Sequence, residues 1–441
     1  MTLTAASVAL TFFTTILLGR VLGPADFGSY SLALTTVMLL ASLSYTGLGV
    51  LIVRESAVAA ARDLGRLRQV VRAGYVTALA MSLVIVGALA IGITALADIW
   101  TWERRATFGW AGLLVPVLAL VTVQSSVLRG LGRPIAGQVS EVIVRPFVFA
   151  TLLVLWLAAG LEALGPANAM ALHAGAGLGC LLVSIGVYRA LGPKHNRISA
   201  LPDSVGSWGR WGNSLSMFSV VYGVSALGNS IDLLVLGLLT NDATAGIYRV
   251  VGQFALIAPL AIATISGILQ PQIAELYASD QRAELQRRIT HASRIAFAIA
   301  LGAFAVFSLS GNTLISLAFG HAFAGGGTAL AITAAGQLSY GVFGPAIHVL
   351  NMTGHERDTA QGLALAAATT LIGSFALIPF LGLNGAALAS AAGLVSGQFY
   401  LTRKVRARTG LECSAFFKLQ KSASMFVPTV SSVQRKLPND V

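Results

Sequence analysis

Five charged side chains lie within or at the ends of stretches that are otherwise almost free of charge. They are Arg20, Arg54, Arg145, Asp232 and Arg249. A charge inside hydrocarbon must meet water or an opposite charge, because lipid supplies neither. An arginine binds phosphate oxygens through two parallel hydrogen bonds, and a buried carboxylate can bind a proton or a sodium ion. This pattern predicts a site that binds an anionic group, with an acid for a coupling ion.

Arg145 has two interpretations that the sequence leaves open. In the first, it is a cavity cation beside Pro146, which frees a backbone carbonyl of the helix. In the second, it forms an ion pair with Glu141, four residues earlier on the same helical face.

The other candidates have alternatives as well. Arg20 and Arg249 stand at the outer ends of matching helices, where they either face one cavity or extend to the membrane interface. Arg54 stands at the inner end of its segment, as a binding residue or as a positive anchor. Asp232 has no basic residue within one turn, so it either carries a coupling proton or sodium ion or pairs with an arginine elsewhere. His173 is expected to pack.

Motifs of catalysis are absent from the sequence. There is no GxxxxGK[ST] loop for ATP hydrolysis, and GxSxG, HExxH and CxxC are missing too. Cys180 and Cys413 are too few for a disulfide framework or a zinc site. We therefore predict that the chain is not an enzyme and needs no cofactor other than a coupling ion.

The composition predicts an all-α integral membrane protein. Of 441 residues, 56% are hydrophobic and only 10% are charged, whereas a soluble protein carries about 25% charged residues. A transmembrane helix needs about 20 mostly apolar residues. Segments of this kind are predicted at 3–19, 29–53, 73–97, 106–128, 139–159, 167–191, 213–239, 245–271, 295–319, 328–352, 359–381 and 384–401.

The basic residues give an orientation to these twelve segments. Most of the 29 Lys and Arg residues fall in alternate loops, beginning with the arginine-rich loop at 54–72, and in the C-terminal tail. Such loops face the cytoplasm, so both termini are predicted to be cytoplasmic. The net charge of +12 is explained in the same way, and we do not expect nucleic-acid binding. The charged stretch 275–294 predicts an amphipathic helix at the interface.

A weak internal repeat suggests how the segments are grouped. The sequence FGSYSLA from Phe27 resembles AGIYRVV from Ala245, and NAMALHAGAGL from Asn168 resembles NGAALASAAGL from Asn384. A repeat of six helices keeps its orientation, so the halves would be related by a pseudo-two-fold axis along the membrane normal. We predict six-helix bundles at 1–191 and 213–402, a cytoplasmic linker at 192–212 and a basic cytoplasmic tail at 403–441.

Several segments resemble a known family, the flippases of polysaccharide biosynthesis, within the superfamily of multidrug and oligosaccharidyl-lipid exporters. The resemblance extends from the first helix to about residue 403. It rests on GRVLGPADFGSYSLALTTVMLLASLSYTGLGVLIVRE, DLLVLGLLTNDATAGIYRVVGQFA, PQIAELYASDQRAELQRRI and LIPFLGLNGAALASAAG. Family members usually begin with a short polar leader, so we expect the start to be truncated or Met1 not to be the natural initiator.

The resemblance implies alternating access around a central cavity in the inner membrane of a bacterium. Its implied substrate is an oligosaccharide on undecaprenyl diphosphate, moved from the inner to the outer leaflet. Expected partners are this lipid-linked oligosaccharide, membrane lipids, and the polymerase and glycosyltransferases of the same pathway. A cation-coupled multidrug exporter and an envelope polymerase or ligase are the alternatives. The first expects acidic cavity residues, and the second needs a catalytic loop.

Overall fold

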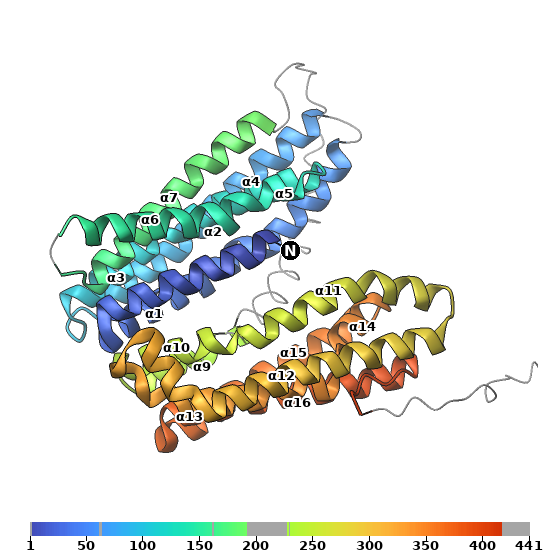
Figure 1. Cartoon of the computed structure of the whole chain (residues 1–441). Coiled ribbons are helices and arrows are strands. Elements are labelled where there is room, and N and C mark those ends of the chain that lie inside the picture. The colour runs from blue at the N-terminus through green and yellow to red at the C-terminus, as the bar shows by residue number, and fades with distance from the viewer. Residues whose placement is uncertain (1, 61–63, 161–162, 192–226, 229, 417–441) are drawn as a thin grey trace, which may run out of the picture.

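The computed structural model of the chain (Figure 1) describes residues 2–60, 64–160, 163–191, 227–228 and 230–416, and every regular element in these ranges is a helix. The helices of the first half are α1 (Thr2–Ala60), α2 (Leu64–Ala95), α3 (Trp102–Gly112), α4 (Leu114–Gly130), α5 (Pro134–Val139), η1 (Ser140–Val144), α6 (Arg145–Ala158) and α7 (Pro166–Leu191). The second half contains α9 (Ile231–Leu239), α10 (Asp242–Ala255), α11 (Ile257–Ala278), α12 (Arg282–Phe319), η2 (His321–Gly326), α13 (Gly327–Phe343), α14 (Ala346–Met352), α15 (Glu356–Leu381) and α16 (Leu383–Thr409).

The long helix α1 is two helices joined at a sharp bend. Its 59 residues would form a rod about 90 Å long if straight, about three times the thickness of the hydrocarbon core. The bend is at Gly23, with φ 72° and ψ 176°, a backbone conformation that glycine adopts without steric cost. Pro24 follows, and its fixed φ suits the first turn of a new helix. Two predicted segments, 3–19 and 29–53, therefore both lie in α1.

The class of the fold is confirmed: the protein is an all-α, multi-pass membrane protein. Eight helices in the described ranges are long and apolar enough to cross a membrane. In this count the long helix α1 is one span. A ninth is obtained if α13 and α14, bent by 45° at a short break, form one span. The number of twelve and the division into two six-helix bundles stay predictions.

The helices are arranged in two groups (Figure 1). The first contains α1 to α7, and the second contains α9 to α16. The predicted linker 192–212 lies outside the described residues. The predicted tail begins within α16, which continues to Thr409.

The two groups meet at backbone distance near one end of the molecule, where α1 packs on α10. A Cβ atom added at Gly28 would lie 1.7 Å from the carbonyl oxygen of Asp242, and one at Gly246 would lie 2.0 Å from that of Pro24. Only glycine permits such a close approach. Arg104 and Asp242 add an ion pair of 3.5 Å between the groups. Toward the opposite end the groups diverge in Figure 1.

An extended segment at 410–416, which we call the strap, follows α16 and packs along α12. Gln286 exchanges two hydrogen bonds with the backbone of Glu412, at 2.6 and 2.8 Å. The Ser293 hydroxyl donates to the carbonyl of Cys413 at 2.6 Å. The side chains of Leu411 and Cys413 are buried in this contact. The strap thus fixes one face of the first turns of α12.

The prediction of a separate amphipathic helix at 275–294 is wrong. In the structure α11 continues to Ala278, a turn follows, and α12 begins at Arg282. Asp280 in the turn has a φ of 55°, and aspartate is one of the few residues that tolerate this left-handed conformation. The charged residues are therefore the adjoining ends of two long helices.

Candidate functional site

A cavity of about 90 Å³ lies between the two groups and brings together two of the predicted arginines. From the first group, α1, α6 and α7 supply most of its wall, and α10 supplies the side of the second group. The lining residues are Thr11, Thr14, Thr15, Leu18, Phe27, Tyr30, Ser31, Leu34, Arg145, Pro146, Phe149, His173 and Arg249.

A distortion of the helix positions Arg145. The residues before it, Ser140–Val144, form the π-helix η1, and α6 starts at Arg145 with Pro146 next. Proline has no N–H to continue the α-helical ladder, and short π-helices recur at functional sites. Within the described part of the chain, no ion pair joins Arg145 to Glu141. The cavity interpretation of Arg145 therefore agrees better with the geometry than the ion-pair interpretation.

Arg249 approaches the same cavity from α10. Tyr30, Arg145 and Arg249 all line this one cavity, so two guanidinium groups share it with one phenol. Among the described residues neither arginine forms an ion pair. The result is a small cavity with two positive charges and no carboxylate in its wall.

Tyr30 and His173 are lining residues whose role the sequence did not predict. The Tyr30 hydroxyl and Nδ1 of His173 are hydrogen-bonded at 2.6 Å, and the Phe149 ring lies 4.5 Å from the imidazole, centroid to centroid. Both polar residues belong to the repeated segments, and this was the available signal. The expectation that His173 only packs missed its place in the cavity wall.

Three threonines form a polar stripe on α1. Thr11, Thr14 and Thr15 follow the spacing of neighbours on one helical face. The hydroxyls of Thr14 and Thr15 donate to backbone carbonyls one turn earlier, each at 2.7 Å. Their oxygens keep acceptor capacity for a ligand hydroxyl.

Asp232 lies outside this cavity, in the first turn of α9. Its carboxylate accepts hydrogen bonds from the Tyr248 hydroxyl at 2.7 Å and from the backbone N–H of Leu233 at 2.8 Å. The Ser390 hydroxyl of α16 lies beside both side chains. Tyr248, its hydrogen-bond partner, is the residue before Arg249 on α10, and Arg249 lines the cavity.

The structure places the last two candidates elsewhere. Arg20 donates to the carbonyl of Ala318 at 2.6 Å and to that of Leu317, at the C-terminus of α12. Cations are favoured there by the helix dipole. Arg54 pairs with Glu55 at 3.2 Å and is exposed. Of the five predicted residues, only Arg145 and Arg249 line the cavity, and the roles of all five stay predictions.

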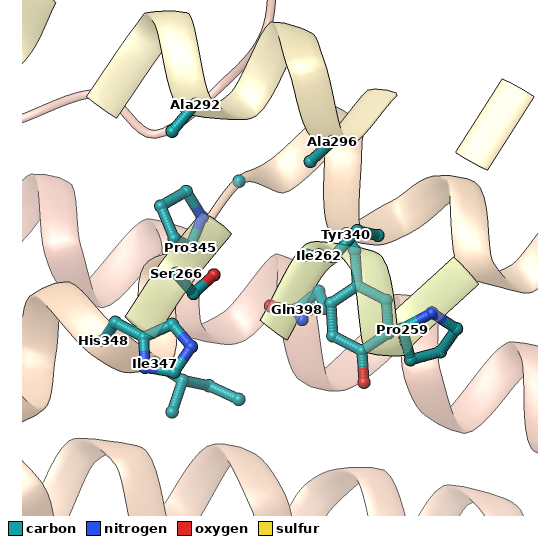
Figure 2. A pocket seen from close by; sticks show the side chains of 11 residues that line it. Pro259, Ile262, Ser266, Ala292, Ala296, Tyr340, Pro345, Ile347, His348 and Gln398 are labelled. Atoms are coloured by element: carbon teal, nitrogen blue, oxygen red, sulfur yellow. The ribbon is translucent and has the colours of Figure 1, made fainter. Parts of the chain in front are cut away.

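A larger cavity, of about 250 Å³, lies inside the second group (Figure 2). Figure 2 shows His348, Pro345 and Ser266 on one side and Tyr340, Gln398 and Pro259 on the other. Its lining is mostly apolar, and it includes no arginine, lysine or carboxylate. Because it offers no charge to an anionic group, we assign the candidate site to the smaller cavity.

Comparison with known proteins agrees with this fold. Residues 1–277 match the family described as polysaccharide biosynthesis protein. The chain belongs to the polysaccharide biosynthesis protein family. No curated protein sequence matches it. The family and the fold agree with the prediction of a membrane transport protein rather than an enzyme.

Solved structures with this fold are transporters. The lipid II flippase MurJ, in an inward closed conformation, gives a TM-score of 0.73 at 12% identity, over 92% of this chain and 86% of that chain. An inward-facing multidrug resistance MATE family transporter of the MOP superfamily gives a TM-score of 0.70 at 15% identity, over 90% of this chain and 94% of that chain. An outward-facing MATE family transporter gives a TM-score of 0.59 at 15% identity, over 92% of this chain and 93% of that chain.

Proposed function

We propose that this member of the polysaccharide biosynthesis protein family is a flippase for an oligosaccharide carried on undecaprenyl diphosphate. It would move this lipid from the inner to the outer leaflet of a bacterial cytoplasmic membrane. The observation that carries the proposal is the cavity between the two helix groups, with Arg145 and Arg249 in its wall and no acid.

The chemistry of the cavity suits a diphosphate. Moving such a group through hydrocarbon unpaired costs several kcal/mol or more. Two guanidinium groups offset this cost, because each can donate two parallel hydrogen bonds to phosphate oxygens. The carrier tail, which is apolar, can stay in lipid between helices.

The size of the cavity limits what it holds in this conformation. One water molecule occupies about 30 Å³ of the liquid, so 90 Å³ accommodates a phosphate group but not an oligosaccharide. We propose that the diphosphate is held at the arginines and that the sugars extend toward the end where the groups diverge. The threonine stripe and the Tyr30–His173 pair would then contact the first sugar.

A cation-coupled multidrug exporter fits this cavity less well. A cationic drug requires a negative charge or an aromatic surface free of competing cations. Here Arg145 and Arg249 would repel it. The cavity therefore supports the lipid-linked substrate over the drug.

The orientation is part of the proposal. The end where the groups diverge carries the turn between α11 and α12, with Arg282, Arg287 and Arg288 after it (Figure 1). By the positive-inside rule this is the cytoplasmic end. The TM-score is higher with the inward-facing MATE family transporter, 0.70, than with the outward-facing one, 0.59. Both observations support an inward-facing state with cytoplasmic termini. The glycosyltransferases that build the lipid-linked sugar would then deliver it at this end, and a polymerase would receive it outside.

The decisive experiment measures flipping of a lipid-linked oligosaccharide by the purified, reconstituted protein. Arg145→Ala should abolish flipping at a normal yield of folded protein. Arg145→Lys should recover part of it, since lysine supplies charge without the two-pronged geometry. The matched control is Arg357→Ala, which removes an exposed arginine outside the cavity. Full activity in the double variant Arg145→Ala/Glu141→Ala would overturn the headgroup role.

We further propose that Asp232 binds the coupling proton or sodium ion. Its carboxylate accepts a hydrogen bond from Tyr248, the residue before the cavity-lining Arg249 on α10. Asp232→Asn should abolish transport that depends on an ion gradient while the protein still folds and inserts. Equal transport by the variant and the parent across a range of pH and sodium concentrations would remove Asp232 from the coupling mechanism.

A further inference from the structure

An open groove of about 580 Å³ lies at the adjoining ends of α11 and α12, and none of its lining residues lines the cavity of Arg145 and Arg249. The side chains of α12 in it recur every three or four residues, so they share one face of the helix. They are Glu284, Arg287, Arg288, His291, Ala292, Arg294 and Ile295, and α11 adds Ile268, Leu269 and Gln272.

The groove carries a surplus of positive charge. Glu284 pairs with Arg287 and with Arg288, each at 2.8 Å. Arg288 also donates to the side-chain oxygen of Gln272 at 2.8 Å, which ties α12 to α11. Arg294 adds a third arginine to the groove, and its Nε donates to the carbonyl of Ala415 at 3.2 Å. Because exposed ion pairs are worth only about 0–1 kcal/mol, a phosphate can replace Glu284 as the partner of Arg287 and Arg288.

The groove is also apolar on the side that faces away from the protein interior. Ile268 is 57% exposed and Ile295 is 39% exposed. Such side chains beside arginines suit a molecule that is anionic at one end and aliphatic at the other. The strap binds Gln286 and Ser293 on the other face of α12, and its Ala415 carbonyl accepts the hydrogen bond from Arg294 at the edge of the groove.

We infer that this groove binds an anionic phospholipid of the leaflet at this end of the protein. Its phosphate contacts Arg287 and Arg288, and its acyl chains lie against Ile268 and Ile295. Basic pockets between helices on the cytoplasmic side suit anionic lipid headgroups. A free phosphate would use the charges but not the exposed isoleucines. The site is independent of the transported lipid, whose binding is assigned to Arg145 and Arg249.

The test uses the full-length protein in phosphatidylcholine vesicles with and without phosphatidylglycerol. Lipid that stays bound is counted by native mass spectrometry, and thermal unfolding is recorded in parallel. Arg287→Gln/Arg288→Gln should weaken phosphatidylglycerol binding about tenfold or more, as expected for two lost contacts. Arg189→Gln/Arg357→Gln removes the same charge from exposed positions and should leave binding unchanged. Glu284→Gln should strengthen it, because a competing carboxylate is gone.

Two results would overturn the inference. Equal losses in the two double variants would show that only total charge matters. Stabilisation by inorganic phosphate as large as that by phosphatidylglycerol would show a simple anion site. Ile268→Ser further distinguishes a phospholipid site from a simple anion site, since it should weaken lipid binding and leave phosphate binding unchanged.

Discussion

The segments 27–31 and 245–249 have similar sequences and meet face to face, yet they do different things. Gly28 and Gly246 have the same role in both, because each lets the backbone of the other group approach. The residues that follow diverge. Tyr30 bonds to His173 in the wall of the cavity, whereas Tyr248 bonds to Asp232 outside it.

The last position of each segment differs most. Ser31 and Arg249 are at matching places in the repeat, and both line the cavity. One repeat therefore contributes a neutral hydroxyl, and the other contributes a charge with an acid nearby. The comparison shows that the close contact between the halves requires a glycine at the same place in each repeat. The residues that the two segments add to the cavity wall differ, because only the segment 245–249 supplies a charge.

Arg249→Ser makes the second segment like the first and should have the largest effect of any change within these two segments. Hydrogen bonds to a charged group contribute about 1.5–3 kcal/mol, so flipping of the lipid-linked oligosaccharide should slow about tenfold to a hundredfold. The measurement is the rate in reconstituted vesicles. Ser31→Ala is the control and should change the rate little. A normal flipping rate in Arg249→Ser would show that the charge of Arg249 is not needed for flipping.

Gly246→Ala tests the part that the segments share. Its Cβ would lie 2.0 Å from the carbonyl of Pro24, and forcing the groups apart should cost about 1–3 kcal/mol. Gly252→Ala is on the same helix with nothing within 4 Å and should stabilise by about 0.5–1 kcal/mol. Thermal unfolding in detergent compares them. If Gly246→Ala is as stable as Gly252→Ala, the close contact is not formed.

The smallest expected effect is the difference in the free energy of unfolding between Tyr248→Phe and Tyr30→Phe. Tyr248→Phe removes a hydrogen bond to a carboxylate, worth about 1.5–3 kcal/mol, and Tyr30→Phe removes one to a neutral imidazole, worth about 0.5–1.5 kcal/mol. Tyr248→Phe should therefore lower the free energy of unfolding more, by about 1 kcal/mol. Equal losses would contradict the assignment of different partners.

The features that depend on local composition, such as the membrane helices and the charges within them, could be predicted from the sequence. An apolar run of sufficient length must be a membrane helix, so the class of the fold followed directly. Charges in such runs are costly, which is why Arg145 and Arg249 could be chosen in advance. The bend at Gly23 also carried a signal, since Gly-Pro ends one helix and starts another.

What depends on distant contacts could not be predicted. Tyr30 and His173 are 143 residues apart in the sequence, and Arg20 reaches a carbonyl 298 residues away. An arginine at the end of an apolar run suits a cavity or a helix C-terminus equally well. Only the packing of the two groups decides between them.

The strap has a consequence for how the protein is made. Gln286 of α12 is bonded to Glu412, which is synthesised 126 residues later. While the chain is still on the ribosome, α12 is in the membrane without this partner. Leu285 and Ile289 belong to the buried cluster that includes Leu411, so this cluster also lacks one of its members for the same period. Chains assemble from the N-terminal part first, so the first helix group can pack during synthesis. The second group can complete its packing on α12 only after the strap has been synthesised.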